Sequence, residues 1–137
     1  MGNHSHDHVD NRYPHSEIIS RIIAAAQQVH YHLGPGFREV IYQRALALEL
    51  RIQGLTFSRE GRIPIHYRGT SLAHSRVDFI VEEVLVEIKG KAELEAVEVV
   101  QTLSYLKAAY AKIALLLNFG ARKLASKRLI QSESLNH

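Results

Sequence analysis

The sequence predicts an α/β domain in which helices flank a mixed central β-sheet. Two stretches with helical periodicity open the chain, strand-like apolar segments follow, and a third helical stretch separates the last apolar runs. The expected order is α-α-β-β-β-α-β, followed by a segment that favours one more strand. This order, without an internal repeat, indicates a mixed sheet covered by helices.

The composition sets the limits of this interpretation. A chain of 137 residues is the size of one domain, and 46% apolar with 23% charged residues excludes wholesale disorder. The absence of cysteine excludes disulfides, thiol nucleophiles and cysteine-ligated metal sites. No apolar run approaches the ~18 residues of a membrane span and no signal peptide is apparent, so we expect a cytoplasmic protein without membrane contact.

The ends of the chain differ in composition from the rest. Residues 1–15 are polar and rich in histidine, but no apolar periodicity would hold these side chains in a fixed geometry. We therefore interpret this segment as a flexible leader or cloning remnant rather than a metal site. Residues 16–131 are expected to form the domain, and residues 132–137 a tail.

Two helices are expected first. One begins at Ser16, which suits a helix cap, and stops at Gly34-Pro35-Gly36. Its apolar face contains Ile18, Ile19, Ile22, Ile23, Ala26 and Val29. The second runs from about Phe37 to Gln53 and ends at Gly54. Its inward residues are expected to be Val40, Ile41, Ala45, Leu48 and Ile52.

Three strands are expected next. Ile63 and Ile65 alternate with polar residues, a turn follows at residues 68–70, and residues 72–81 return. The Glu82-Glu83 link leads into residues 84–89, and Gly90 closes this third strand.

The last third of the chain predicts one helix and two strands. The helix spans about Ala92 to Tyr110, and one of its faces contains Val99, Leu103, Leu106 and Tyr110. Residues 113–117 are continuously apolar, which is typical of a buried central strand, and residues 118–120 turn. Residues 124–130 fit a strand or a helix, and we favour the strand.

The residues that carry chemistry are Asp78, Glu87 and Lys89. Side chains alternate along a strand, so Glu87 and Lys89 share a face, roughly 6.6 Å apart. The preceding strand runs antiparallel through the short link, which allows Asp78 to lie near Glu87. Two neighbouring carboxylates repel each other unless a cation lies between them, and hard oxygen ligands favour Mg²⁺ or Mn²⁺. An ammonium beside such a metal could orient and acidify a water for attack on a phosphodiester.

A structural interpretation of the same residues stays open. Glu87 and Lys89 would then form a surface ion pair of little energetic value, with Asp78 a solvated acid at the end of a hairpin. The apolar context of the strands favours the metal site, as do Glu39 on an upstream helix and Gln101 on the following helix.

Charge is distributed unevenly along the chain, although the formal net charge is only +3. Residues 78–98 contain seven acids and two bases, whereas residues 99–132 contain six bases and no acid. Acids at one point with bases around them suit a metal site that handles phosphates. Solvated faces of an ordinary domain would give the same pattern.

Several motifs are similar to those of the GxxExxY proteins, a bacterial and archaeal family assigned to the PD-(D/E)xK nuclease superfamily. The naming motif is Gly36-Phe37-Arg38-Glu39-Val40-Ile41-Tyr42. Further matches are Val29-His30, Leu33-Gly34-Pro35-Gly36, Ala45-Leu46-Ala47-Leu48-Glu49-Leu50, Ile63-Pro64-Ile65, Val77-Asp78-Phe79, Val86-Glu87-Ile88-Lys89, Gln101-Thr102-Leu103-Ser104-Tyr105-Leu106-Lys107 and Leu115-Leu116-Leu117-Asn118-Phe119-Gly120. The resemblance covers roughly Ser16 to Ile130.

The resemblance implies a restriction-endonuclease-like core of order α-β-β-β-α-β, and it implies roles for single residues. Asp78 and Glu87 match the metal-binding acids, the carbonyl of Ile88 would be a further ligand, and Lys89 matches the catalytic lysine. Glu39 resembles the acid of the first helix that joins the metal shell. Gln101 resembles the polar residue of the following helix.

Other residues keep two interpretations. Tyr42 lies one turn from Glu39 and would either orient that acid or a phosphate, or fill the core as an aromatic wedge. His30 is expected to be a satisfied core histidine rather than a ligand. Lys91, in the Gly90-Lys91-Ala92-Glu93 segment that departs from many family members, would hold a phosphate or project into solvent. Lys107 is a further candidate for phosphate binding.

We therefore expect a Mg²⁺-dependent (or Mn²⁺-dependent) nuclease that hydrolyses phosphodiester bonds of nucleic acid, with DNA favoured over RNA. No helix-turn-helix, zinc finger or aromatic platform is apparent, so specificity would depend on DNA shape, a partner protein or a homodimer. The alternative is a catalytically silent module that kept the nuclease fold and binds nucleic acid or protein.

Overall fold

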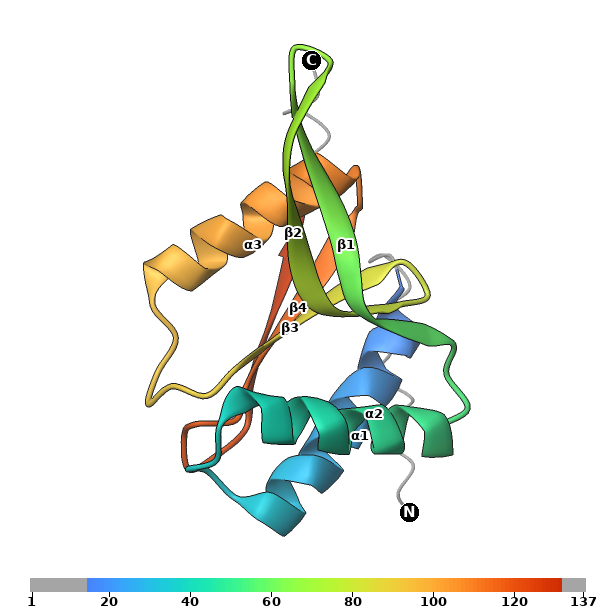
Figure 1. Ribbon diagram of the computed structural model, residues 1–137. Helices are drawn as coiled ribbons and strands as arrows, with labels where there is room; N and C mark the ends of the chain where they lie inside the picture. The colour runs from blue at the N-terminus through green and yellow to red at the C-terminus, as the bar shows by residue number, and fades with distance from the viewer. Residues whose placement is uncertain (1–14, 132–137) are drawn as a thin grey trace.

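The computed structural model describes residues 15–131, in which a single sheet lies between two layers of helices (Figure 1). The sheet has five strands in the order β1-β2-β3-β4-β5. They are β1 (Phe57–Tyr67), β2 (Thr70–Val81), β3 (Val84–Lys89), β4 (Ile113–Asn118) and β5 (Ala125–Ile130). The predicted mixed α/β fold is confirmed, including the final strand. The expected leader falls almost wholly outside the described residues, and the expected tail falls outside them entirely.

The direction of each strand follows from its connection. β3 and β4 are parallel, and helix α3 (Ala96–Ala109) forms the crossover between them. The other neighbouring strands pair antiparallel. Glu82 and Glu83 both have positive φ angles, 45° and 79°, which suits a tight two-residue hairpin between β2 and β3.

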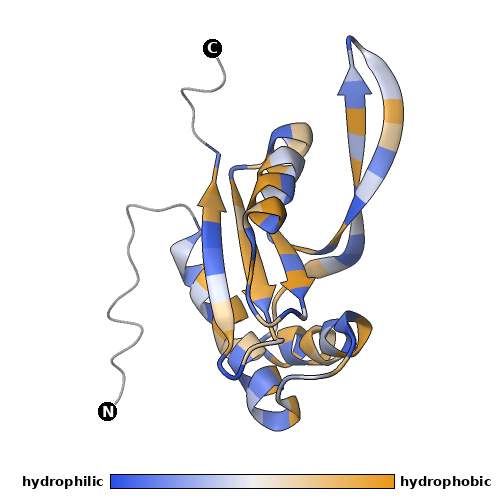
Figure 2. Cartoon of the chain, turned by 90° about the vertical axis from the view of Figure 1, so that its left-hand side faces the viewer, coloured by the Kyte–Doolittle hydropathy of each residue, from blue (hydrophilic) through white to orange (hydrophobic). Residues whose placement is uncertain are grey.

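The helices cover opposite faces of the sheet. Helices α1 (Ser16–Leu33) and α2 (Glu39–Ile52) pack over the larger apolar cluster, which includes Val86 and Leu115 from the central strands. Helix α3 covers the other face, where Leu106 packs with Leu85 and Ala114. In Figure 2 the strands at the centre of the sheet are mostly orange, and the helices show orange segments beside blue ones. Within residues 15–131, none of the helices has the length and apolar character needed to cross a membrane.

Two expected helix faces were wrong. Leu48 and Ile52, predicted to point inward, are 60% and 76% exposed, and Leu46 and Leu50 are buried instead. The buried residues of α2 are Tyr42, Gln43, Leu46, Ala47 and Leu50, so its inner face is turned relative to the expected one. Helix α3 starts at Ala96 rather than Ala92, where Glu95 and Glu98 form a capping box.

The far end of α3 differs as well. Tyr110 is the left-handed C-cap of this helix and is 90% exposed, so it does not belong to the buried face that we expected. Leu106 of that face is buried, whereas Leu103 is exposed.

Only a short part of the β1–β2 hairpin is paired with the remaining strands of the sheet. β1 begins at Phe57, before the expected first strand, and the two strands pair almost to the turn at Arg68 and Gly69. β2 pairs with β3 only through Phe79–Val81. Ile63 and Val77 are still buried in the cluster under α3, and beyond them the hairpin projects away from the body of the domain, as Figures 1 and 2 show.

Candidate active site

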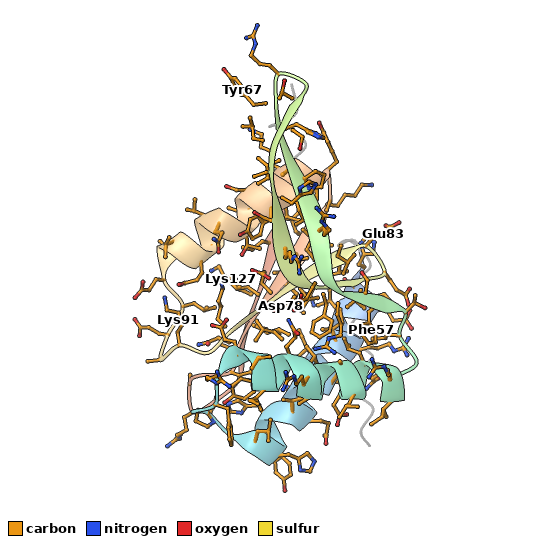
Figure 3. All side chains as sticks on the ribbon, in the orientation of Figure 1. Phe57, Tyr67, Asp78, Glu83, Lys91 and Lys127 are labelled. Carbon is orange, nitrogen blue, oxygen red and sulfur yellow. The ribbon has the colours of Figure 1, made fainter. Side chains whose placement is uncertain are left out.

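The candidate site lies at the fork where β2 leaves β3. The last ladder pair is Phe79 with Val86, so Asp78 and Glu87 are the first residues beyond it. The Asp78 amide donates to Glu87 Oε1 (3.0 Å), and the Ile88 amide donates to Asp78 Oδ2 (2.8 Å). Carboxylates thus replace the ladder hydrogen bonds, and the two acids meet as the hairpin geometry predicted. Figure 3 shows Asp78 between the hairpin, α2 and α3.

Glu87 is held in an environment that disfavours its charge. The residue is only 6% exposed, and burial followed by the neighbouring Asp78 carboxylate raises the pKa of Glu87 from its ordinary 4.5 to about 8. Lys89 Nζ lies 3.9 Å from Glu87 Oε2 and offsets only part of this effect. The fork therefore concentrates carboxylate oxygens where a cation would relieve their repulsion.

The second oxygen of Asp78 is bound by a residue that the sequence analysis missed. Gln43 Nε2 donates to Asp78 Oδ1 (2.7 Å), and Arg59 donates to Gln43 Oε1 (2.9 Å). Gln43 is buried on α2, four residues after Glu39, so both side chains lie on the same helix face. That i, i+4 spacing was the available signal. The chain from Arg59 through Gln43 fixes the orientation of the Asp78 carboxylate.

Glu39 reaches the same strand from α2 but contacts a different group. Its Oε2 accepts a hydrogen bond from the Gly90 amide (3.1 Å), directly after Lys89. Within residues 15–131, no three or more His, Asp or Glu side chains converge closely enough to hold a metal ion. The structure therefore brings Asp78 and Glu87 together and leaves Glu39 beside them, at the end of β3.

This donor set suits a magnesium ion. Mg²⁺ prefers hard oxygen ligands, and it is commonly held by one or two carboxylates while water and substrate phosphate fill its other positions. The Ile88 amide faces Asp78 across the fork. In an extended strand the N–H and C=O of a residue point the same way, so the Ile88 carbonyl faces the fork too. Two carboxylates and a main-chain carbonyl are therefore available from adjacent strands.

A polar clamp holds the chain that follows β3. The buried Asn118 side chain accepts from the Lys91 amide (2.9 Å) and donates to the Lys91 carbonyl (2.9 Å). A Cβ atom at Gly120 would lie 2.3 Å from the Lys91 nitrogen and 2.4 Å from the Gly90 carbonyl carbon. The loops after β3 and β4 are packed backbone against backbone, which fixes the exit of the strand that carries Glu87 and Lys89.

Comparison with known proteins identifies the family. The sequence matches the PD-(D/E)XK nuclease superfamily over residues 16–129, most of the chain. The protein belongs to this superfamily. No curated protein matches the sequence.

A solved structure with low sequence identity, SSO0001, shares the fold. SSO0001 superposes with a TM-score of 0.53 at 18% identity, over 70% of this chain and 52% of that chain. This chain thus spans about half the length of SSO0001. An alkaline exonuclease, LHK-Exo from Laribacter hongkongensis, gives a TM-score of 0.48 at 15% identity, covering 85% of this chain and 72% of that one. A phage related exonuclease from Haemophilus somnus 129PT gives 0.46 at 10% identity, covering 85% and 74%.

In this PD-(D/E)XK protein, Tyr42 has the core role of the two that the sequence allowed. Its side chain is completely buried, and its ring stacks on Phe119 with centroids 4.8 Å apart. The hydroxyl donates to the Gly34 carbonyl (2.6 Å) and accepts from the Phe37 amide (3.1 Å). The hydroxyl is thus engaged within the fold, and both of its hydrogen bonds brace the loop between α1 and α2.

His30 and Lys91 are also engaged within the fold. His30 lies in the last turn of α1, and its ring nitrogen Nε2 is 2.9 Å from the Ala121 carbonyl oxygen. It is therefore a satisfied histidine, as expected. Lys91 Nζ is bound to Glu98, and this hydrogen bond raises the pKa of Lys91 and lowers that of Glu98. Lys91 therefore anchors the start of α3 and is not a free cation for a phosphate.

Gln101 and Lys107 are exposed on α3. Among the described residues no hydrogen bond joins Gln101 to either acid of the fork. Lys107 lies nine residues beyond Glu98, roughly 13 Å further along the helix axis. The structure therefore does not bring these two side chains into contact with the fork.

Proposed function

We propose that this protein is a divalent-metal-dependent nuclease that hydrolyses phosphodiester bonds in DNA and belongs to the GxxExxY group of its superfamily. The observation that carries the proposal is the fork. The Asp78 amide donates to the Glu87 carboxylate (3.0 Å), and the Lys89 ammonium lies 3.9 Å from the other oxygen of that carboxylate. Buried paired acids beside an amine, in a chain of this superfamily, suit phosphodiester hydrolysis.

The ion would be held by the carboxylates of Asp78 and Glu87 and by the carbonyl of Ile88. Mg²⁺ or Mn²⁺ suits these oxygen donors. When bound, such an ion supplies Lewis acidity toward the phosphate and acidity toward water. The Arg59–Gln43 chain keeps Asp78 pointing into the fork, so little reorganisation is needed.

Lys89 supplies the positive group of the protein itself. We assign its ammonium two tasks, which are to orient the attacking water and to stabilise the negative charge that develops on the phosphate oxygens. Its side chain is 18% exposed, so it is desolvated yet reachable from solvent. We assign Glu39 to fixing the end of β3 through the Gly90 amide. Gln101, exposed on α3, stays a candidate for contact with the substrate.

A cleavage assay tests this function. Purified protein is incubated with supercoiled plasmid and Mg²⁺ or Mn²⁺, with EDTA as the negative control. Asp78→Asn, Glu87→Gln and Lys89→Met should each lower the rate at least ~10²-fold, as expected for groups that act in the transition state. Glu93→Gln and Lys127→Met remove the same charges at exposed positions and should cut like the wild type. Activity that persists in both Asp78→Asn and Lys89→Met would come from a contaminant and would refute the proposal.

Calorimetry tests the metal site separately. Mg²⁺ should bind the wild type, and Glu87→Gln should weaken that binding more than tenfold because one of two carboxylate ligands is lost. A wild-type protein that binds no divalent ion and cuts nothing would favour the silent nucleic-acid or protein-binding module instead.

A further inference from the structure

The β1–β2 hairpin carries a concentrated positive charge between Gly61 and Val77, a range whose lower end (Ile63 and Val77) is buried against α3 and whose remainder projects. Residues 61–77 contain three arginines, two histidines and no acid. Their formal charge of +3 equals that of the whole chain, so the rest of the molecule is neutral on balance. All five side chains, Arg62, His66, Arg68, His74 and Arg76, are exposed. The body is neutral only in sum, since residues 99–132 contain six bases and no acid, and the hairpin adds a second cationic surface that attracts a polyanion.

Two of these arginines are placed against each other. Arg62 and Arg76 are direct partners across the two strands, so their side chains leave the same face about 5 Å apart. Like charges in this position destabilise a sheet. Arg76 is relieved by an ion pair with Glu60 (3.0 Å), but Arg62 has no acidic partner among the described residues. The repulsion between Arg62 and Arg76 destabilises the hairpin when no ligand is bound. An anion bound across the two side chains would relieve this repulsion.

The hairpin also leads directly to the candidate site. Arg76 and His74 precede Asp78 by two and four residues on β2, or roughly 7 and 13 Å along the strand. Beyond the last pair with β3, β2 continues from Asp78 back to Thr70, a length of roughly 27 Å. A phosphate chain held along this arm would enter the fork at Asp78.

We propose that the β1–β2 hairpin is the arm that binds double-stranded DNA and delivers it to the fork at Asp78 and Glu87. This inference rests on the proposed nuclease function. A two-stranded β-ribbon fits the major groove of B-form DNA, about 12 Å wide, whereas the major groove of duplex RNA is deep and narrow. The register shift between Ile65 and His66 adds twist to the ribbon, which favours following a groove. Tyr67, at the tip (Figure 3), and Leu72 are both exposed and offer apolar contact to sugars and bases.

Binding is measured without cleavage, by fluorescence anisotropy of a labelled duplex of about 20 base pairs in EDTA. The test variant is Arg62→Gln with Arg68→Gln, which removes two cations that have no acidic partner in the described part of the chain. The matched control is Lys127→Gln with Arg128→Gln on β5, at the opposite edge of the sheet. Loss of two phosphate contacts should weaken binding more than tenfold at about 0.1 M salt and make the slope of log K against log salt shallower by about 2. The control should bind within about twofold of the wild type.

The melting temperatures of the variants and the type of nucleic acid bound distinguish duplex-DNA binding from a purely structural role of the arginines. Arg62→Gln alone should melt at the same temperature as the wild type or higher, because it relieves the like-charge pair. If the double variant melts lower, Arg62→Lys with Arg68→Lys should restore the salt slope without restoring bidentate contacts. Duplex RNA and single-stranded DNA should bind the wild type at least tenfold more weakly than duplex DNA.

Three results would overturn the inference. They are unchanged duplex binding in the hairpin variant, an equal loss in the β5 control, and equal affinity for duplex RNA. Because the assay contains no divalent ion, a protein that cuts nothing can still show the expected hairpin-dependent binding of duplex DNA. A protein that cuts plasmid but binds DNA independently of the hairpin fails this inference alone, so the two proposals are tested apart.

Discussion

Asn118 holds Lys91 by both polar groups of its backbone, accepting from the amide and donating to the carbonyl at 2.9 Å each. The same Oδ1 also accepts from the Gly120 amide (3.2 Å). These bonds tie the ends of the two parallel central strands to one another. The strand that carries Glu87 and Lys89 therefore owes the position of its last residues to a side chain on its neighbour.

Asn118→Leu should damage both stability and catalysis. The substitution keeps the volume but leaves buried backbone groups without partners, which costs about 1–3 kcal/mol in the free energy of unfolding. We expect kcat to fall more than tenfold with little change in KM, because the residue positions β3 rather than touching substrate. Urea denaturation and plasmid-cleavage kinetics check the two effects. Ser126→Ala on β5 is the control, and a variant with normal kcat would contradict the positioning role.

Gly120→Ala tests the backbone contact between the two loops. A Cβ atom would come within 2.4 Å of backbone atoms of both Gly90 and Lys91, so the loop after β3 must move. We expect a loss of about 1–3 kcal/mol in the free energy of unfolding and weaker Mg²⁺ binding by calorimetry. Mg²⁺ affinity equal to that of the wild type would show that the site tolerates a shifted loop.

Gln43→Leu separates the orientation of Asp78 from its charge. The variant removes the donor to Asp78 Oδ1 but keeps both carboxylates at the fork. Loss of such an outer hydrogen bond typically weakens metal binding 10- to 100-fold, which calorimetry would measure. Gln27→Leu, at an exposed position of α1, is the matched control. A purely structural Gln43 would lower the melting temperature and leave the Mg²⁺ affinity unchanged.

Tyr42→Phe decides the role of the tyrosine in the naming motif. The variant loses the hydrogen bonds to Gly34 and Phe37 but keeps the ring that stacks on Phe119. We expect a loss of about 1–3 kcal/mol in stability with KM for plasmid unchanged. A raised KM with full stability would instead indicate that the hydroxyl contacts a phosphate.

The sequence was sufficient to predict the order of the elements and the meeting of Asp78 with Glu87. Both depend on local rules, namely periodicity along a segment and alternation across a two-residue hairpin. It was not sufficient for Asn118 or Tyr42. Lys91 is 27 residues from Asn118, and Phe119, on which the Tyr42 ring stacks, lies directly after β4, so only the packed fold brings these pairs together.

Gln43 and the inner face of α2 show a different limit. The expected inner face contained only apolar residues, and Gln43 was not among them although it is buried. Gln43 is buried because Asp78 and Arg59 satisfy its amide, so the exception marks the site itself.

The raised pKa of Glu87 predicts how stability depends on pH. Burial and then Asp78 raise this pKa from 4.5 to about 8. Between these values the folded protein keeps a proton that the unfolded chain has lost, so the free energy of unfolding should fall as pH rises through this window. The contribution of Glu87 is fully present below about pH 4.5 and is lost above about pH 8.

Comparison with Glu87→Gln isolates this contribution from other titrating groups. The amide stays neutral, so stability of the variant relative to wild type should increase from about pH 5 to about pH 8, as measured by urea denaturation. Mg²⁺ binds the ionised carboxylate, so the rise in melting temperature caused by saturating Mg²⁺ should grow with pH in the wild type. In the Glu87→Gln variant this rise should be much smaller. A difference between the two proteins that stays constant across the window would show that Glu87 ionises normally, and the fork would then not be primed for a cation.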